Sequence, residues 1–566
     1  MLFLNTSNIY IFYLTILNTF CYNILMGIPS YFSYIVKNHP LIIKKYIKNV
    51  LKVDNLYLDC NSIIYDAYNK MDVNKLTDSV VVSIIKCVIS KIEEYISIIQ
   101  PSKTLIIAFD GVAPVAKLDQ QRSRRYKSWY QNEITRVIYK KETADAWNTT
   151  AITPGTKFMA ELNETITNHF NKNSCLNYKI NEILVSGSNK VGEGEHKLFD
   201  YIRLNELKHS TETTIIYGLD ADLIMLSINH LPVCPNIYLF RETPHFIQSI
   251  DSSLEPNENY FLDIPELSNC IINYMANGSE LTKEQQKYKV YDYIFLCFFL
   301  GNDFLPHFPA VNIRTGGVDK MLNAYKATIG DKNENLTNGK IIYWNNVRKV
   351  VQYLANLEEE FIIKEHRSRN NKEKHFIPNT TPEEQFKKFE LTPLHEREIE
   401  HFINPVKPYW QSRYYRSLFG IKSDSNDEQK RDIAINYLQG LEWTMKYYTS
   451  GCPDWRWRYK YEYPPLLQDL IRYIPVFETT FVPQKPINPV TEMVQLCYVL
   501  PRTSLNLLPN KLYYELITRY DHWYKGNCEY KWAYCRYFWE SHVEMNEIDI
   551  DELEKFISEH RHMWIS

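Results

Sequence analysis

Residues 213–222 read TTIIYGLDAD, and this stretch sets the pattern on which the rest of the chain can be interpreted. Residues 213–217 are mostly β-branched or aromatic, which is typical of a short buried strand. An acidic pair, Asp220 and Asp222, follows at the carboxyl end of that strand. The pair alone is a weak signal, because an aspartate after a strand is usually a helix cap or a turn residue.

Three further runs resemble residues 213–217 in length and side-chain type, at residues 55–58, 104–109 and 182–185. Amphipathic stretches separate the runs, and we expect helices there. Thr153-Pro154 at the start of one such stretch would serve as N-cap and first helical residue. Regular alternation of strand and helix predicts an α/β fold with a central, mainly parallel sheet.

Acidic residues follow these runs and one more apolar run at residues 294–300. In open α/β sheets the carboxyl ends of parallel strands line one edge, where ligands bind. We therefore expect these acids to converge at one edge and to form the catalytic centre. The set comprises Asp59, Asp110, Glu193, Glu195, Asp220, Asp222 and Asp303.

Seven carboxylates at one edge would repel each other unless cations neutralised them. Hard oxygen ligands without thiols or paired imidazoles favour Mg²⁺, with Mn²⁺ as a substitute, over zinc. Two such ions about 4 Å apart can stabilise the attacking and leaving oxygens of a phosphodiester displacement. The set therefore predicts a two-metal phosphodiesterase.

A basic helical face follows Asp110 along the chain. Lys117, Gln121, Arg124 and Arg125 are spaced so that all four lie on one side of a helix. Arginine forks bind phosphate bidentately and lysine adds a point charge, so we expect a pocket for a 5′-phosphate. The alternative is a solvated helix face, which is the more usual fate of a basic run.

Composition allows two or three domains, at 566 residues with a net charge of −3. We expect an upstream or non-core extension at 1–25, an α/β domain with the acidic set at 26–356, a charged linker or long surface helix at 357–404, and a helical, aromatic-rich region at 405–566. Residues 1–25 carry no charge, so a secretory signal or membrane segment is the alternative there. The eleven cysteines form no zinc-spaced cluster, and we expect a reducing, cytoplasmic compartment without stable membrane association.

In combination, the motifs make the chain resemble the XRN-type 5′→3′ exoribonucleases from Met26 to near its end, as a compact member without the long C-terminal extension. The motifs that carry the resemblance are Met26–Phe32 (MGIPSYF), Leu56–Asn61 (LYLDCN), Asp110–Lys117 (DGVAPVAK), Gln120–Arg125 (QQRSRR), Ile152–Met159 (ITPGTKFM), Gly192–Lys197 (GEGEHK), Tyr217–Leu226 (YGLDADLIML), Cys297–His307 (CFFLGNDFLPH), Gly440–Trp443 (GLEW), Trp455–Trp457 (WRW), Leu500–Arg502 (LPR) and Tyr534–His542 (YCRYFWESH).

This resemblance implies a nuclease core related to PIN domains and flap endonucleases. It implies that Asp59, Asp110, Glu193 and Glu195 hold one ion, and that Asp220, Asp222 and Asp303 hold the other. It further implies processive removal of mononucleotides from single-stranded RNA with a 5′-monophosphate, a role in mRNA decay, decapping factors as partners, and a monomer.

The chain departs from the family pattern after its first metal-binding aspartate, where Ser62 and Tyr65 replace a glycine and a histidine. Tyr65 would then take over base stacking, with Trp455 or Trp457 as its partner, although ordinary core packing is as good an interpretation of either tryptophan. Two other functions remain open. A structure-specific endonuclease could use the same metal centre, and a catalytically inactive RNA-binding protein could keep the fold.

Overall fold

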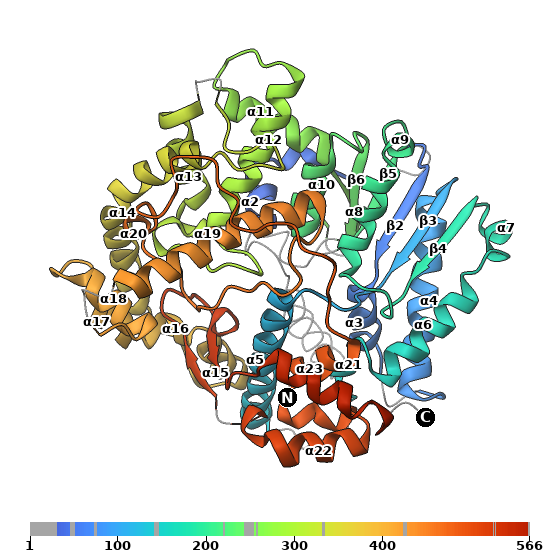
Figure 1. Ribbon diagram of the computed structural model, residues 1–566. Coiled ribbons are helices and arrows are strands. Elements are labelled where there is room, and N and C mark those ends of the chain that lie inside the picture. The colour runs from blue at the N-terminus through green and yellow to red at the C-terminus, as the bar shows by residue number, and fades with distance from the viewer. Residues whose placement is uncertain are drawn as a thin grey trace, which may run out of the picture. The chain divides into compact units, whose positions relative to one another are not determined.

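Figure 1 shows the computed structural model of the chain. The chain divides into two compact units. Unit 1 comprises residues 1–113 and 151–274, and unit 2 comprises residues 114–150 and 275–566. The structure describes residues 31–45, 51–72, 76–140, 147–218, 221–242, 254–255, 258–330, 334–422, 427–524, 526 and 528–563. The MGIPSYF motif up to residue 30, and Leu219 and Asp220, lie outside the described residues.

Unit 1 is built on a seven-stranded sheet in the order β1-β7-β6-β5-β2-β3-β4. Strands β2 to β6 run parallel to one another, whereas β7 is antiparallel to both β6 and β1. The strands are β1 (Ile43–Lys45), β2 (Asn55–Asp59), β3 (Thr104–Ala108), β4 (Glu182–Ser186), β5 (Thr214–Tyr217), β6 (Ile237–Glu242) and β7 (Asn259–Asp263). The predicted α/β class and its mainly parallel sheet are confirmed.

Strand order fixes where a ligand can bind. In the sheet, β3 and β4 follow β2 on one side, and β5 then pairs with β2 on its other side. The carboxyl ends of β2, β3 and β5 therefore meet at a topological switch point, the usual ligand-binding position in such sheets. The helices of this unit are α2 (Tyr31–Asn38), α3 (Asn61–Asn69), α4 (Val80–Ile99), α6 (Lys157–His169), α7 (Ser174–Tyr178), α8 (Gly194–Leu204), α9 (Glu206–His209), α10 (Asp222–His230) and α11 (Ile264–Ala276), the last of which ends two residues beyond the unit.

One predicted helix start is wrong by three residues. Helix α6 begins at Lys157, and Thr156 is its N-cap, because the Thr156 hydroxyl accepts a hydrogen bond from the amide of Met159 at 3.3 Å. Thr153, the predicted N-cap, is buried before the helix begins.

Unit 2 is largely helical, and one small hairpin of β8 (Glu529–Lys531) and β9 (His542–Glu544) accompanies its helices. Its helices are α5 (Val115–Tyr139), α12 (Lys283–Cys297), α13 (Gly317–Tyr325), α14 (Trp344–Glu373), α15 (Pro382–Glu390), α16 (Thr392–His395), α17 (Glu398–Ile403), α18 (Trp410–Phe419), α19 (Asp427–Ser450), α20 (Leu467–Leu470), α21 (Glu492–Val499), α22 (Asn510–Tyr520) and α23 (Ile550–Glu559). Among the described residues, none of the helices in the chain is long and apolar enough to cross a membrane.

The charged stretch at residues 357–404 is not an exposed linker. Helix α14 runs through it to Glu373, as the alternative of a long helix predicted, and α15 to α17 occupy most of the remainder. Arg369 is 3% exposed and binds the equally buried Glu400 through two nitrogens, at 2.7 and 2.8 Å. The compact units also divide the chain elsewhere than the predicted domain boundaries, since α5 and residues 275–356 group with the helical unit.

A buried polar network stabilises the segment that leads to Asp303. Asp292 on α12 is fully buried and accepts hydrogen bonds from the amides of Leu336 and Thr337 and from the hydroxyl of Tyr325, at 2.7 to 3.0 Å. Lys289 in turn donates to the Tyr325 hydroxyl at 2.8 Å. Burial raises the pKa of Asp292 to about 7, although these hydrogen bonds oppose the rise.

This raised pKa predicts a pH-dependent stability. In the folded chain Asp292 keeps its proton up to about pH 7, whereas in the unfolded chain it loses the proton near pH 4. The stabilisation of the fold by the protonated carboxyl is therefore complete below pH 4 and is lost as the pH rises through about 7. Asp292→Asn removes the titration and keeps the amide-accepting oxygen. Urea unfolding at pH 5 and pH 8 should show the variant gaining stability relative to the wild type as pH rises, by about 1.4 kcal/mol per pH unit at most. A difference that does not change with pH would contradict the assignment.

Candidate active site

Two carboxylates end neighbouring strands in unit 1. Asp59 is the last residue of β2 and is 8% exposed, and Asp110 lies two residues beyond the end of β3. The strands pair in register, with Asp59 opposite Ala108, so the sheet itself sets the distance between the two acids. This arrangement is the one predicted from the strand-end positions.

Asp110 is held by two hydrogen-bond donors. The side-chain amide of Asn61, in the first turn of α3, donates to Asp110 Oδ2 at 2.5 Å. The backbone amide of Gly194, the first residue of α8, donates to Asp110 Oδ1 at 2.6 Å. The amide of Asp110 also donates to Asn61 Oδ1 at 3.1 Å, so the orientation of the carboxylate is fixed from both sides. Sequence reasoning missed this role of Asn61, and the only signal for it was its place in the LYLDCN motif.

Gly194 lies against both acids. A Cβ atom built on Gly194 would be 2.4 Å from Asp59 Oδ1 and 3.4 Å from Asp110 Oδ1. Both carboxylate oxygens therefore converge on one point beside the start of α8, and only a residue without a side chain leaves room for them. This observation explains the glycine between Glu193 and Glu195 in the GEGEH motif.

Hydrogen bonds connect the loop that carries Glu193 to the segment that follows β3. Lys197 donates from its ammonium group to the carbonyl oxygens of Phe109 and Gly187, at 2.7 and 2.9 Å. Gly111 and Gly192 also pair across the two loops through backbone hydrogen bonds of Gly111 to Gly192 and of Gly192 to Val112, each at 2.8 Å. Glu193 at the N-cap position and Glu195 in the first turn of α8 are consequently buried, at 2% and 6% exposure.

The predicted second group of acids is divided between the units. Asp222 begins α10 in unit 1 and is 2% exposed, whereas Asp220 lies outside the described residues. Asp303 belongs to unit 2. It follows a helix, α12, and a short 3₁₀ turn at Phe298–Leu300, so its predicted strand-end position is wrong.

Lys117 and Asp303 contact each other within unit 2. The Lys117 ammonium lies 2.6 Å from Asp303 Oδ2, and the side chains are only 1% and 6% exposed. Gln120 donates to the other carboxylate oxygen at 3.4 Å. A predicted phosphate ligand and a predicted metal ligand are therefore brought together, and each neutralises the other's charge in a dry environment.

The remaining phosphate-pocket candidates lie on the same helix, α5. Gln121 is buried, and Arg124 and Arg125 are partly exposed. Arg122, between them, is a structural residue, because it is 3% exposed and donates to the carbonyl of Trp523 at 3.1 Å. That these residues bind a phosphate, and that they lie near the acids of unit 1, remain predictions.

The base-stacking candidates differ in their surroundings. Tyr65 is partly exposed and lies one turn after Asn61 on α3, on the face that reaches Asp110. Trp455 is also partly exposed. Trp457 is 9% exposed and stacks on Trp443, with ring centroids 5.2 Å apart, which is core packing. Of the two tryptophans, Trp455 is the better candidate for contact with a base.

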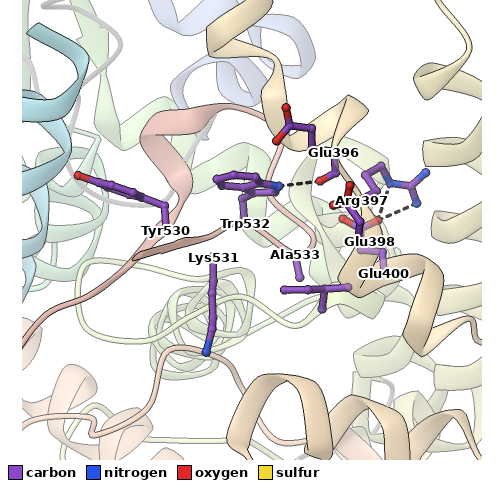
Figure 2. Close-up of a pocket in the computed structure, with 9 residues that line it drawn as sticks. Glu396, Arg397, Glu398, Glu400, Tyr530, Lys531, Trp532 and Ala533 are labelled. Atoms are coloured by element: carbon purple, nitrogen blue, oxygen red, sulfur yellow. Dashed lines mark hydrogen bonds and ion pairs between the residues drawn. The ribbon is translucent and has the colours of Figure 1, made fainter. Parts of the chain in front are cut away.

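A separate hollow of about 80 Å³ in unit 2 contains none of the predicted site residues. It is lined by residues 396–400 and 530–533, as Figure 2 shows. The Trp532 indole donates to the carbonyl of Glu396 at 2.6 Å, and Arg397 binds Glu400, so these polar lining groups already have partners.

The donor set fits a hard divalent cation. Asp59, Asp110, Glu193, Glu195 and Asp222 offer carboxylate oxygens and no sulfur, and the absence of a side chain at Gly194 lets two of these carboxylates approach its backbone. By distance alone, no group of three or more His, Cys, Asp or Glu side chains in the described part of the chain forms a metal site. The ligand set for each ion therefore remains a prediction.

Unit 1 has carboxylates at the switch point of a mainly parallel sheet, an arrangement that PIN-like nuclease folds share. Residues 26–243 match the XRN 5′-3′ exonuclease N-terminus, and residues 285–401 and 395–522 match the Xrn1 helical domain. The chain belongs to the XRN family of 5′-3′ exonucleases.

Similar proteins span most of this chain. The 5′-3′ exoribonuclease 2 of Arabidopsis thaliana is 25% identical over 88% of the chain and 63% of its own length. Its homolog in Drosophila melanogaster is 27% identical over 86% and 65%. The 5′-3′ exoribonuclease 1 of Homo sapiens is 28% identical over 88% and 32%. The chain thus spans less than two thirds of the length of each of these relatives.

The position of Gly194 generates a test of the centre. In Gly194→Ala the added methyl group would meet Asp59 Oδ1 at 2.4 Å, so the Asp59 carboxylate must shift. We expect Mn²⁺ affinity, measured by titration calorimetry, to fall roughly ten- to a hundredfold. Gly526→Ala is the matched control, since a Cβ there has no heavy atom within 4 Å. Equal Mn²⁺ affinity in both variants would mean that no ion binds beside Gly194.

Proposed function

We propose that this protein is a 5′→3′ exoribonuclease that hydrolyses single-stranded RNA with a 5′-monophosphate, processively and with two Mg²⁺ ions, in cytoplasmic RNA decay. The convergence of Asp59 Oδ1 and Asp110 Oδ1 beside the Gly194 backbone carries the proposal. Such paired, fixed carboxylates suit a divalent cation, and the sheet of an XRN-family nuclease delivers them. An upstream decapping activity would supply RNA with the required 5′ end.

The chain's own residues would prepare the reaction before the substrate arrives. When bound, the Mg²⁺ ions would supply an activated water and stabilise the leaving oxygen. Asp59, Asp110, Glu193 and Glu195 would hold one ion, and Asp220, Asp222 and Asp303 the other. Asn61 and the Gly194 amide fix the orientation of Asp110 through hydrogen bonds of 2.5 and 2.6 Å, so that no reorientation is needed during turnover.

Helix α5 would select the 5′ end of the RNA. Arg124 and Arg125 are partly exposed and can fork around a terminal phosphate. Lys117 has its charge balanced by Asp303, at 2.6 Å, and would contribute mainly by positioning that carboxylate. A partly exposed Tyr65 on α3 and Trp455 in unit 2 would offer ring faces to bases, which stack without regard to sequence.

The substrate and direction can be tested with RNA labelled at its 3′ end, carrying either a 5′-monophosphate or a 5′-hydroxyl. With Mg²⁺, only the monophosphate substrate should be lost, without intermediates of partial length. Chelation with EDTA should abolish the loss, because the carboxylates need the cation to act. Asp222→Asn should lower kcat about a hundredfold or more, since it removes charge at a buried position.

Each alternative function has its own signature in this assay. Cleavage at internal positions of the RNA would support a structure-specific endonuclease and contradict the exonuclease. RNA binding without turnover would indicate an inactive binding protein. Full activity in Asp222→Asn would remove this residue from the metal site.

The phosphate pocket is tested by Arg124→Gln, with Arg367→Gln as a control at an exposed arginine of α14. Loss of a charge-assisted phosphate contact should lower kcat/KM for 5′-monophosphate RNA about tenfold to a hundredfold. The low rate on 5′-hydroxyl RNA should not change, because that substrate lacks the group that Arg124 binds. If both substrates slow equally, Arg124 does not read the 5′ end.

A further inference from the structure

The segment Arg536–Ser541 lies along helix α5 in unit 2. Lys127 donates from its ammonium to the carbonyl of Ser541 at 3.0 Å, and the ring of Tyr130 lies 5.4 Å from that of Phe538. Burial lowers the pKa of Lys127, which is consistent with a closely packed contact. The segment is therefore a fixed neighbour of the helix to which we assign 5′-phosphate binding.

Two guanidinium groups gather at one ring of this segment. The Arg314 and Arg536 guanidinium carbons lie 5.7 and 5.2 Å from the centroid of Tyr537. Arg314 is balanced by Glu540, at 2.6 Å. The Nε atom of Arg536, by contrast, is buried and has no hydrogen-bond partner within the part of the chain that the structure describes.

A third cation, Lys372 near the end of α14, interacts electrostatically with both of these arginines. Lys372 is half-buried, and burial lowers its pKa. Glu365 opposes this decrease, whereas the positive charges of Arg536, Arg369 and Arg314 add to it. Arg369 is neutralised by Glu400 and Arg314 by Glu540, so the two positive charges of Lys372 and Arg536 are opposed by the single charge of Glu365 and are only partly balanced.

We propose that Arg314, Lys372 and Arg536, with Tyr537 as an aromatic wall, form a second anion site that binds a nucleotide phosphate. Half-buried cations that repel each other are stabilised by an anion, and the buried guanidinium Nε of Arg536 has no acceptor among the described residues. The group is either an internal phosphate of the RNA or the phosphate of a released nucleoside 5′-monophosphate. The inference rests on the proposed function in that it takes RNA as the source of this phosphate.

The test measures binding in EDTA, where no turnover occurs, with a short 5′-hydroxyl oligouridylate and with uridine 5′-monophosphate as probes. Arg536→Gln and Lys372→Gln should each weaken oligouridylate binding about tenfold. The slope of log K against log salt should become shallower by about 0.7 for each lost contact. Lys374→Gln, at an exposed lysine just after α14, is the matched control and should bind as the wild type does.

The two probes separate the two sources. Weaker binding of the oligouridylate alone assigns the site to an internal phosphate, and weaker binding of uridine 5′-monophosphate as well assigns it to the product. Arg536→Lys, which keeps the charge, should restore part of the affinity, whereas a purely structural role would show instead as a lower Tm in Arg536→Gln and Arg536→Lys alike. Unchanged binding of both probes, or a wild type that binds neither, overturns the inference. Turnover of 5′-monophosphate RNA with Mg²⁺ by the wild type is measured in parallel, so failure of the proposed function is seen separately.

Discussion

The constraint that organises unit 1 is the repulsion between carboxylates brought together at the end of its sheet. The buried Asp59 and the partly exposed Asp110 direct oxygens toward the same point beside Gly194. Like charges a few ångströms apart cost on the order of 1 to 4 kcal/mol even where water screens them. The fold offsets part of this cost with the amide donors of Asn61 and Gly194. The favourable N-terminal dipole of α8, where Glu195 lies in the first turn, offsets more.

The glycines of the GEGEH region follow from that constraint. The backbone of α8 can donate to Asp110 only if it approaches within hydrogen-bond distance, and a side chain at Gly194 would meet Asp59 Oδ1 at 2.4 Å. Gly111 is similarly enclosed, because a Cβ there would lie 1.7 Å from the carbonyl oxygen of Lys190. Lys197 then joins the two loops through carbonyls of both. The glycines of the motif are therefore required because the two loops and the two acids pack so closely.

Local sequence patterns predict structural features that depend on residues nearby in the chain. They fail for features that depend on residues far away in the sequence. The strands and the acids after them were predictable, because buried runs of β-branched residues and their ends are local features. The start of α6 at Thr156 depends on which hydroxyl reaches an amide, and two threonines compete for that role. The charge density of residues 357–404 suggested that they are exposed. Arg369 is nevertheless buried, because it forms an ion pair with Glu400, 31 residues later. Asp303 looked like a strand-end acid because an apolar run precedes it, and periodicity in so short a run does not distinguish a buried helix from a strand.

The near-neutral net charge of −3 hides a segregation of charge that both units require. Unit 1 collects carboxylates and orients them with neutral amide donors, which leaves their negative charge available to a divalent cation. Unit 2 does the reverse around Tyr537, where carboxylates balance Arg314 and Arg369, and Glu365 only partly balances Arg536 and Lys372. The Lys117–Asp303 pair differs from both clusters, because its two charges balance each other. Both side chains are almost fully buried, so removing either partner would leave a buried charge, at a cost of about 3 to 5 kcal/mol. The pairing of charges within each unit, rather than the overall composition, therefore decides which groups keep unbalanced charge.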